Sequence, residues 1–173
     1  MPELTPKERL QPSLLDRLTD DEPNLKQESR EMRVLSPARL RASVLRDLSW
    51  LFNTTNMAAM HDLEPYPEVV RSVLNYGLPD LAGHTISSID GARLEQVLKQ
   101  AILDFEPRLI AESVRVRLVT DTEANHNNMS LVVEAQLWSQ PLPLNLYLRT
   151  EIDLEDGDIR VAELRDNESR ARG

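Results

Sequence analysis

The sequence has no cysteine, only five glycines and three histidines, and few aromatic residues. Without cysteine the chain forms no disulfide and has neither a thiolate nucleophile nor a cysteine metal ligand, which fits a reducing compartment. Two Trp, two Phe and three Tyr are too few to indicate stacking platforms for bases or sugars. Stacking recognition of nucleic acid is therefore disfavoured from the start.

The scarcity of glycine and the positions of the histidines also argue against phosphate-binding loops, nucleophile elbows and metal sites. Neither a GxGxxG phosphate-binding loop nor a Gly-x-Ser-x-Gly nucleophile elbow occurs in the sequence. His61, His84 and His126 lie in separate loop-like segments, with no second ligand at helical spacing. We predict no metal and no cofactor.

Charge and hydropathy narrow the class of partner. The 29 acidic and 20 basic side chains give a net charge of -9, which argues against a partner held through its phosphates. No apolar run approaches the roughly 20 residues that span a bilayer, and residues 1–6 lack the apolar core of a signal peptide. We expect a cytoplasmic protein with protein partners, no nucleic acid and no direct membrane insertion.

The chain divides by composition into three parts. Residues 1–35 are charged and interrupted by proline, and their leucines at near-helical spacing predict an N-terminal arm with one or two helical turns. These leucines either dock on a partner or pack on the domain itself. Residues 36–165 carry the regular patterns of one domain, and residues 166–173 are expected to be a disordered tail.

Three helices are predicted in the first half of the domain. Ser36-Pro37 is a helix start, and an apolar stripe runs from there to Phe52. Asp47 and the basic residues lie off this stripe, and the basic residues are expected on a solvated face or, alternatively, on a contact surface. A shorter helix follows Pro67 and ends before Gly77, a residue suited to a left-handed cap. The third helix follows Asp90 and ends near Glu106.

After the third helix the hydrophobic period changes from 3.6 to 2. Alternating segments lie at residues 114–119, 131–138, 144–154 and 159–164, with a polar hairpin loop at 121–128 and a turn at 155–158. The predicted fold class is α+β, with about three helices packed on one side of an antiparallel β-meander of three to four strands. The short last strand is expected at the sheet edge, where another chain can pair with it.

The run Glu106-Pro107-Arg108 is the one candidate site. Proline disfavours helical conformation in the preceding residue, so the carboxylate and the guanidinium lie at a rigid corner. Three interpretations are open: an internal ion pair that ties the helix end to the first strand, a docking element whose guanidinium recognises a partner, or a catalytic acid. A muramidase with Glu106 as general acid would need a second carboxylate, from Asp121 or Glu123.

Two features oppose this muramidase. Arg108 stands two residues from Glu106, and a nearby positive charge lowers the pKa of a carboxyl group, whereas a general acid needs a raised pKa. The scarcity of aromatic residues leaves no evident platform for a sugar.

Several motifs together resemble one family. They are LRASVLRDL at 40–48, WLFNT at 50–54, YPEV at 66–69, SVLNYGLPD at 72–80 and FEPRL at 105–109. They are similar to TssE, the baseplate subunit of bacterial type VI secretion systems, in the lysozyme-like wedge-protein family shared with contractile phage tails. The resemblance covers residues 10–164, and one departure is Phe52 where leucine is commoner.

The resemblance implies a structural, non-catalytic role at the baseplate beneath the inner membrane. It implies binding to the wedge proteins TssF and TssG and also to TssK, with Glu106, Pro107 and Arg108 at the contact with the wedge core. It further implies that the protein helps to start polymerisation of the TssB/TssC sheath. By order along the chain, the candidates for the sheath contact are Leu144, Leu146, Leu148, Ile152, Leu154, Ile159 and Val161.

Overall fold

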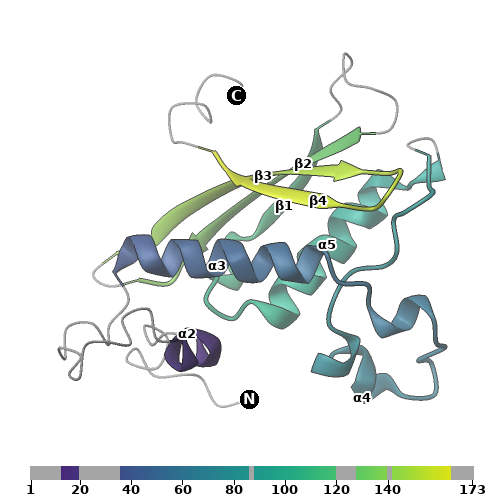
Figure 1. Cartoon of the computed structure of the whole chain (residues 1–173), viewed down its shortest axis with the longest axis horizontal. Coiled ribbons are helices and arrows are strands. Elements are labelled where there is room, and N and C mark those ends of the chain that lie inside the picture. Colours follow the sequence, from purple (N-terminus) through teal and green to yellow (C-terminus); the bar gives the residue numbers. More distant parts are fainter. Residues whose placement is uncertain (1–12, 20–35, 86–87, 120–127, 140–141, 165–173) are drawn as a thin grey trace.

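The computed structural model describes residues 13–19, 36–85, 88–119, 128–139 and 142–164 (Figure 1). Within these ranges four α-helices precede four strands: α2 (Leu14–Leu18), α3 (Pro37–Phe52), α4 (Pro67–Val70), α5 (Gly91–Phe105), β1 (Arg115–Val119), β2 (Asn128–Leu137), β3 (Leu144–Asp153) and β4 (Ile159–Glu163). The predicted α+β class is confirmed. The expected tail at 166–173 and most of the hairpin loop lie outside the described residues, and the domain boundaries stay predictions.

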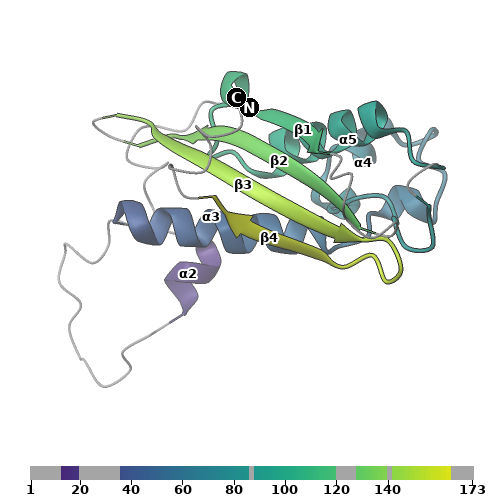
Figure 2. The ribbon, with the colours of Figure 1, turned by 90° about the horizontal axis from the view of Figure 1, so that it is seen from above.

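The four strands form an antiparallel meander in the order β1-β2-β3-β4. Side chains of β2 and β3 alternate between buried and more exposed positions, which is the period-2 pattern of a sheet covered on one face. In Figure 2 the strands lie side by side above α3 and α5, with α3 along β4. The apolar stripes of the two helices and the inner face of the sheet make one core.

The helix starts that the sequence predicts are present. The Ser36 hydroxyl accepts a hydrogen bond from the Arg39 N–H, and Pro37 is the first residue of α3. The Asp90 carboxylate accepts from the Arg93 N–H in the same way at the start of α5. These caps fix where the two long helices begin, and therefore which residues they bring beneath the sheet.

The helix predicted after Pro67 is broken in two, so that prediction is wrong in length. The structure has the four-residue α4 and then the 3₁₀ turn η3 (Val73–Asn75). Ser72 separates them, because its hydroxyl donates to the Val69 carbonyl and accepts from the Leu74 N–H. The apolar residues of this segment do not form a buried stripe.

Gly77 ties this segment to the end of α3. Its φ is +121°, and a Cβ there would lie 2.2 Å from the Thr54 carbonyl oxygen. The absence of a side chain lets Thr55 and Leu78 form a parallel bridge, with hydrogen bonds from Leu78 N–H to the Thr54 carbonyl and from Asn56 N–H to the Leu78 carbonyl.

The predicted edge position of the last strand is confirmed, since β4 pairs only with β3 among the described strands. Ile159 turns its backbone groups outward, where the Asn53 side chain both donates to its carbonyl and accepts from its N–H. Alternate residues of a strand point their backbone the same way, so Val161 and Glu163 also face outward. Their outward backbone groups have no hydrogen-bond partner among the described residues.

Candidate functional site

Glu106 and Arg108 pair with each other at the end of α5. Glu106 is the C-cap residue of the helix and is only 4% exposed. Arg108 Nε donates to Glu106 Oε1 at 2.6 Å and Nη2 donates to Oε2 at 2.5 Å, so the pair is bidentate. Pro107 lies exposed between them. The two charges therefore face each other, which favours the internal ion pair among the three interpretations.

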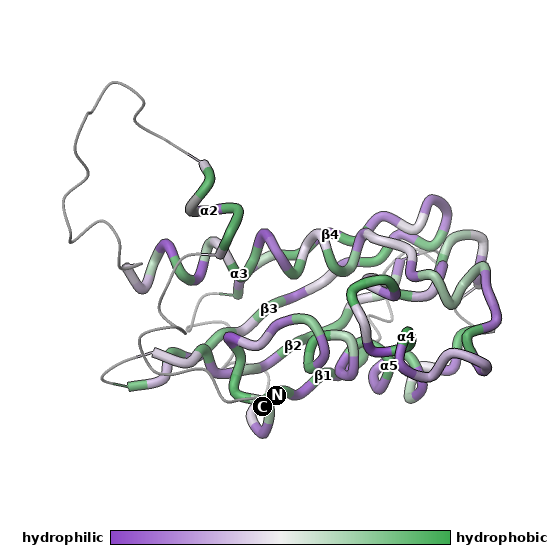
Figure 3. Tube along the Cα trace, turned by 90° about the horizontal axis from the view of Figure 1, so that it is seen from below, coloured by the Kyte–Doolittle hydropathy of each residue, from purple (hydrophilic) through white to green (hydrophobic). Residues whose placement is uncertain are grey.

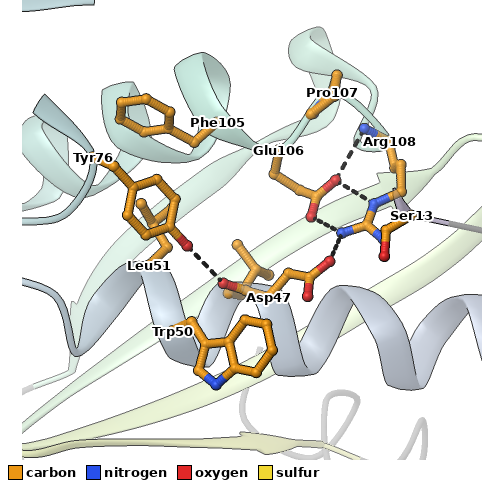
Figure 4. Close-up of a pocket in the computed structure, with 10 residues that line it drawn as sticks. Ser13, Asp47, Trp50, Leu51, Tyr76, Phe105, Glu106, Pro107 and Arg108 are labelled. Atoms are coloured by element: carbon orange, nitrogen blue, oxygen red, sulfur yellow. Dashed lines mark hydrogen bonds and ion pairs between the residues drawn. The ribbon is translucent and has the colours of Figure 1, made fainter. Parts of the chain in front are cut away.

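The pair is held against α3 and not against the first strand. Arg108 Nη2 also donates to Asp47 Oδ2 at 2.6 Å (Figure 4). Arg108 Nη1 donates to the Ser43 hydroxyl at 2.9 Å. Four of the five N–H groups of a guanidinium are thus used inside the protein. Arg108 has little capacity left to form a two-pronged contact with a carboxylate of another chain.

The network continues from α3 to the N-terminal helix α2. Arg46 donates through Nε and Nη2 to Asp47 Oδ1, and through Nη1 to Asp16 Oδ1 at 2.5 Å. Asp16 also accepts from the hydroxyls of Ser43 and Ser13. Five charges of alternating sign thereby connect three segments of the chain, in the order Glu106, Arg108, Asp47, Arg46 and Asp16.

The electrostatics of this network favour the charged forms of Arg108 and Asp16. Burial opposes the charge of Arg108, but the hydrogen bonds and charges of Glu106 and then Asp47 outweigh it and raise the Arg108 pKa. Burial likewise works against the Asp16 carboxylate, but hydrogen bonds from Arg46, Ser13 and Ser43 hold the Asp16 pKa well below its ordinary range. Asp16 and Arg108 are therefore charged members of the network at neutral pH.

A pocket of about 330 Å³ lies beside the buried pair. Its apolar wall includes Phe105 and Tyr76, whose rings meet edge to face with centroids 5.2 Å apart. Trp50 lines the same pocket, is about half exposed, and has the Arg46 guanidinium 5.0 Å from its ring centroid. Burial, followed by the charges of Asp47 and Glu106, raises the pKa of the Tyr76 phenol. The pocket thus combines an aromatic wall with a charged floor.

The sequence did not predict the α3 half of this site. Arg46 was expected on a solvated face and no role was predicted for Asp47, but both belong to the network. Ser43 and Asp47 are four residues apart, hence on one face of the helix beside the apolar stripe, and this spacing was the available signal. Asp47 is also a second carboxylate near Glu106, whereas the candidates Asp121 and Glu123 lie outside the described residues.

The residues named for a sheath contact are mostly core residues. Leu146, Leu148, Ile152, Leu154 and Ile159 are buried, and β3 already pairs with a strand on each side. Leu144 is partly buried and is paired with Leu137 of β2. On this side of the sheet the described part of β4 carries outward backbone groups, and we take the main chain at Val161 as the candidate contact.

The described residues provide neither a cluster of metal ligands nor a membrane-spanning helix. They contain no group of three or more His, Cys, Asp or Glu side chains that could hold a metal ion. None of the helices in the described ranges is long and apolar enough to cross a membrane.

Comparison with known proteins gives one match. A family model described as "Baseplate wedge protein gp25" matches residues 38–142, a span that starts at the beginning of α3 and includes the whole charged corner. Searches of curated proteins and of solved structures gave no match.

Proposed function

The chain belongs to the baseplate wedge protein gp25 family, and from this membership we propose that it is the TssE subunit of a type VI secretion baseplate. Its role there is structural and non-catalytic. It docks on the wedge proteins TssF and TssG, lies near TssK, and helps to start the TssB/TssC sheath. Its place is the cytoplasmic side of the inner membrane, where the baseplate assembles.

The observation that carries the docking proposal is the pocket beside the Glu106–Arg108 pair. Because both charged side chains are used internally, the surface offered to a partner is Pro107 with the aromatic wall of Trp50, Tyr76 and Phe105. Aromatic side chains in a preformed pocket are typical anchors of protein interfaces. Glu106 and Arg108 are then positioning residues, which hold the corner in the shape that the partner binds.

Substitutions at the rim test docking without breaking the network. Trp50→Ala and Pro107→Ala are expected to keep the fold and to lose co-purification with co-expressed TssF and TssG. Leu142→Ala is the matched control, since Leu142 is exposed and does not line the pocket. Wild-type co-purification by both rim variants, with wild-type sheath assembly in cells, would contradict docking at this pocket.

The structure adds a second carboxylate to the muramidase alternative, but it also shows that both carboxylates are paired with arginine. Asp47 supplies a second carboxylate near Glu106, as a glycosidase needs. However, all four oxygens of the two carboxylates accept hydrogen bonds from the guanidinium groups of Arg46 and Arg108. A general acid must donate a proton to the substrate, whereas each of these oxygens already accepts a hydrogen bond from a guanidinium group. Lysis of peptidoglycan by the purified protein, lost in Glu106→Gln, would restore the enzymatic alternative.

A further inference from the structure

The loop region between α3 and Tyr76 carries most of the exposed large apolar side chains. We call residues 57–75 the lobe; it projects beyond the end of α3 and includes α4 (Figure 1). Figure 3 shows hydrophobic and hydrophilic stretches in close succession around α4. The lobe contributes six of the eleven exposed large hydrophobic side chains in the described part of the chain: Met57, Met60, Tyr66, Val70, Val73 and Leu74.

The exposed side chains of the lobe lie on segments that hydrogen bonds hold together. Asn75 is 7% exposed, and its side chain accepts from the Ala58 N–H and donates to the Val70 carbonyl, both at 2.9 Å. One amide thereby joins η2 (Met57–Ala59), α4 and η3. Leu63 adds a buried apolar anchor. Val73 and Leu74, which are neighbours in the chain, are therefore presented to solvent by a hydrogen-bonded turn. Exposed large apolar side chains that lie close together are a feature of binding surfaces.

The charges around the lobe indicate the partner's chemistry. Asp62, Glu64 and Glu68 are exposed and are interleaved with the apolar residues. The one arginine of the lobe, Arg71, lies 3.8 Å from Asp104 of α5. The lobe therefore presents exposed apolar side chains among three carboxylates and one arginine, and this negative balance complements an apolar stripe flanked by lysine or arginine.

The backbone of the lobe indicates the partner's conformation. The lobe contains no strand, and the N–H groups of Tyr66, Val69, Ser72 and Asn75 are bonded within it. It offers no sheet edge to an extended segment, so a partner contacts side chains. An amphipathic helix meets this requirement, because it satisfies its own backbone and presents one apolar stripe.

We propose that the lobe is a second docking surface, which binds an amphipathic helix whose apolar face is bordered by lysine and arginine. The surface goes beyond the docking function proposed above. Trp50, Pro107, Glu106 and Arg108 are not part of it, and the two surfaces can be removed separately.

Helical peptides of defined charge test this proposal on the whole chain. One peptide of leucine and lysine, ~18 residues or about five turns, is compared with a peptide of the same leucine pattern in which glutamate replaces lysine. Binding is followed by NMR titration of the ¹⁵N-labelled protein. The lysine peptide is expected to shift the amide signals of the lobe, and to bind about ten-fold or more tightly than the glutamate peptide.

The matched variants are Val73→Ser with Leu74→Ser, and Leu142→Ser. The lobe variant changes only exposed side chains, so it should fold normally and bind the lysine peptide about ten-fold more weakly. Leu142→Ser should bind like the wild type. Equal binding of both peptides, shifts centred outside the lobe, or unchanged affinity in the lobe variant would each overturn the proposal. Trp50→Ala should leave peptide binding intact even if it abolishes co-purification with TssF and TssG, which separates the two surfaces.

Discussion

Arg108 donates a hydrogen bond of 2.6 Å to the carboxylate of Asp47, and this contact joins the corner after α5 to the middle of α3. The same nitrogen also donates to Glu106. One guanidinium therefore joins the first long helix to the end of the second. Within the protein, the charged residues of the Glu106-Pro107-Arg108 motif connect the end of α5 to α3.

Replacing Arg108 with methionine should destabilise the fold strongly. The change leaves Glu106 buried without its cation, and removal of one partner from a buried pair costs about 3–5 kcal/mol. Arg117→Met is the matched control, because Arg117 pairs with Glu134 on the exposed face of the sheet, where a pair contributes less than about 1 kcal/mol. Urea unfolding followed by circular dichroism compares the two. Similar small losses would contradict a stabilising role for the Arg108 network.

This prediction affects how docking is tested. Alanine at Glu106 or Arg108 removes a partner of a buried ion pair, so lost co-purification with such a variant reports unfolding as readily as lost contact. The exposed rim residues Trp50 and Pro107 avoid this ambiguity.

Gly77→Ala should weaken the junction between α3 and the lobe. A left-handed backbone costs a residue with a Cβ about 1–2 kcal/mol, and overpacking against the Thr54 carbonyl adds about 1–3 kcal/mol. The expected loss is therefore about 2–5 kcal/mol. Gly83→Ala isolates the first cost, since Gly83 has a φ of +74° and no atom within 4 Å of its Cβ position. If thermal melts showed equal losses for the two variants, close contact at Gly77 would not matter.

Local signals in the sequence predicted the parts of the fold that depend on short-range chemistry. Ser36-Pro37 and Asp90 begin helices because they satisfy N–H groups of the first turn, and the alternation at 144–154 is a strand because one face is covered. The meander order followed, since strands joined by short connections tend to pair in sequence.

The contacts between distant segments could not be read in this way. Asp47 is 61 positions before Arg108, and its polar character suits a solvated helix face as well as an ion pair. Which alternative holds depends on how α3 lies against the end of α5, and that packing is decided by the whole core. The lobe differs for another reason: Val70, Val73 and Leu74 have the spacing of a buried stripe, but Ser72 interrupts the helix and turns them outward.

Acid should release α2 from the domain. The Asp16 pKa is lowered in the fold, so the stability that Asp16 contributes is present above its ordinary pKa and is lost as the pH falls towards the lowered value. Asp16→Asn removes the charge at every pH. The difference in melting temperature between wild type and Asp16→Asn is therefore expected to be largest near pH 7 and to shrink as the pH falls below 4.

A constant difference across this range would show that the Asp16 charge does not hold α2. Asp62→Asn serves as the control, because Asp62 is exposed and forms no ion pair among the described residues.

The outward edge of β4 gives a direct test of strand pairing with the sheath. The Val161 N–H points away from β3, so Val161→Pro removes a donor that the sheet itself does not use. We expect a smaller loss of stability than for a proline that breaks the ladder, and a failure of sheath recruitment, because the proline ring also blocks an incoming strand. Ala162→Pro is the contrasting variant: the Ala162 N–H faces β3, and its removal breaks the ladder.

Purified Val161→Pro that melts like the wild type and still starts sheath assembly in cells would exclude main-chain pairing at this edge. The sheath contact would then have to use other surfaces, such as the acidic turn at residues 155–158.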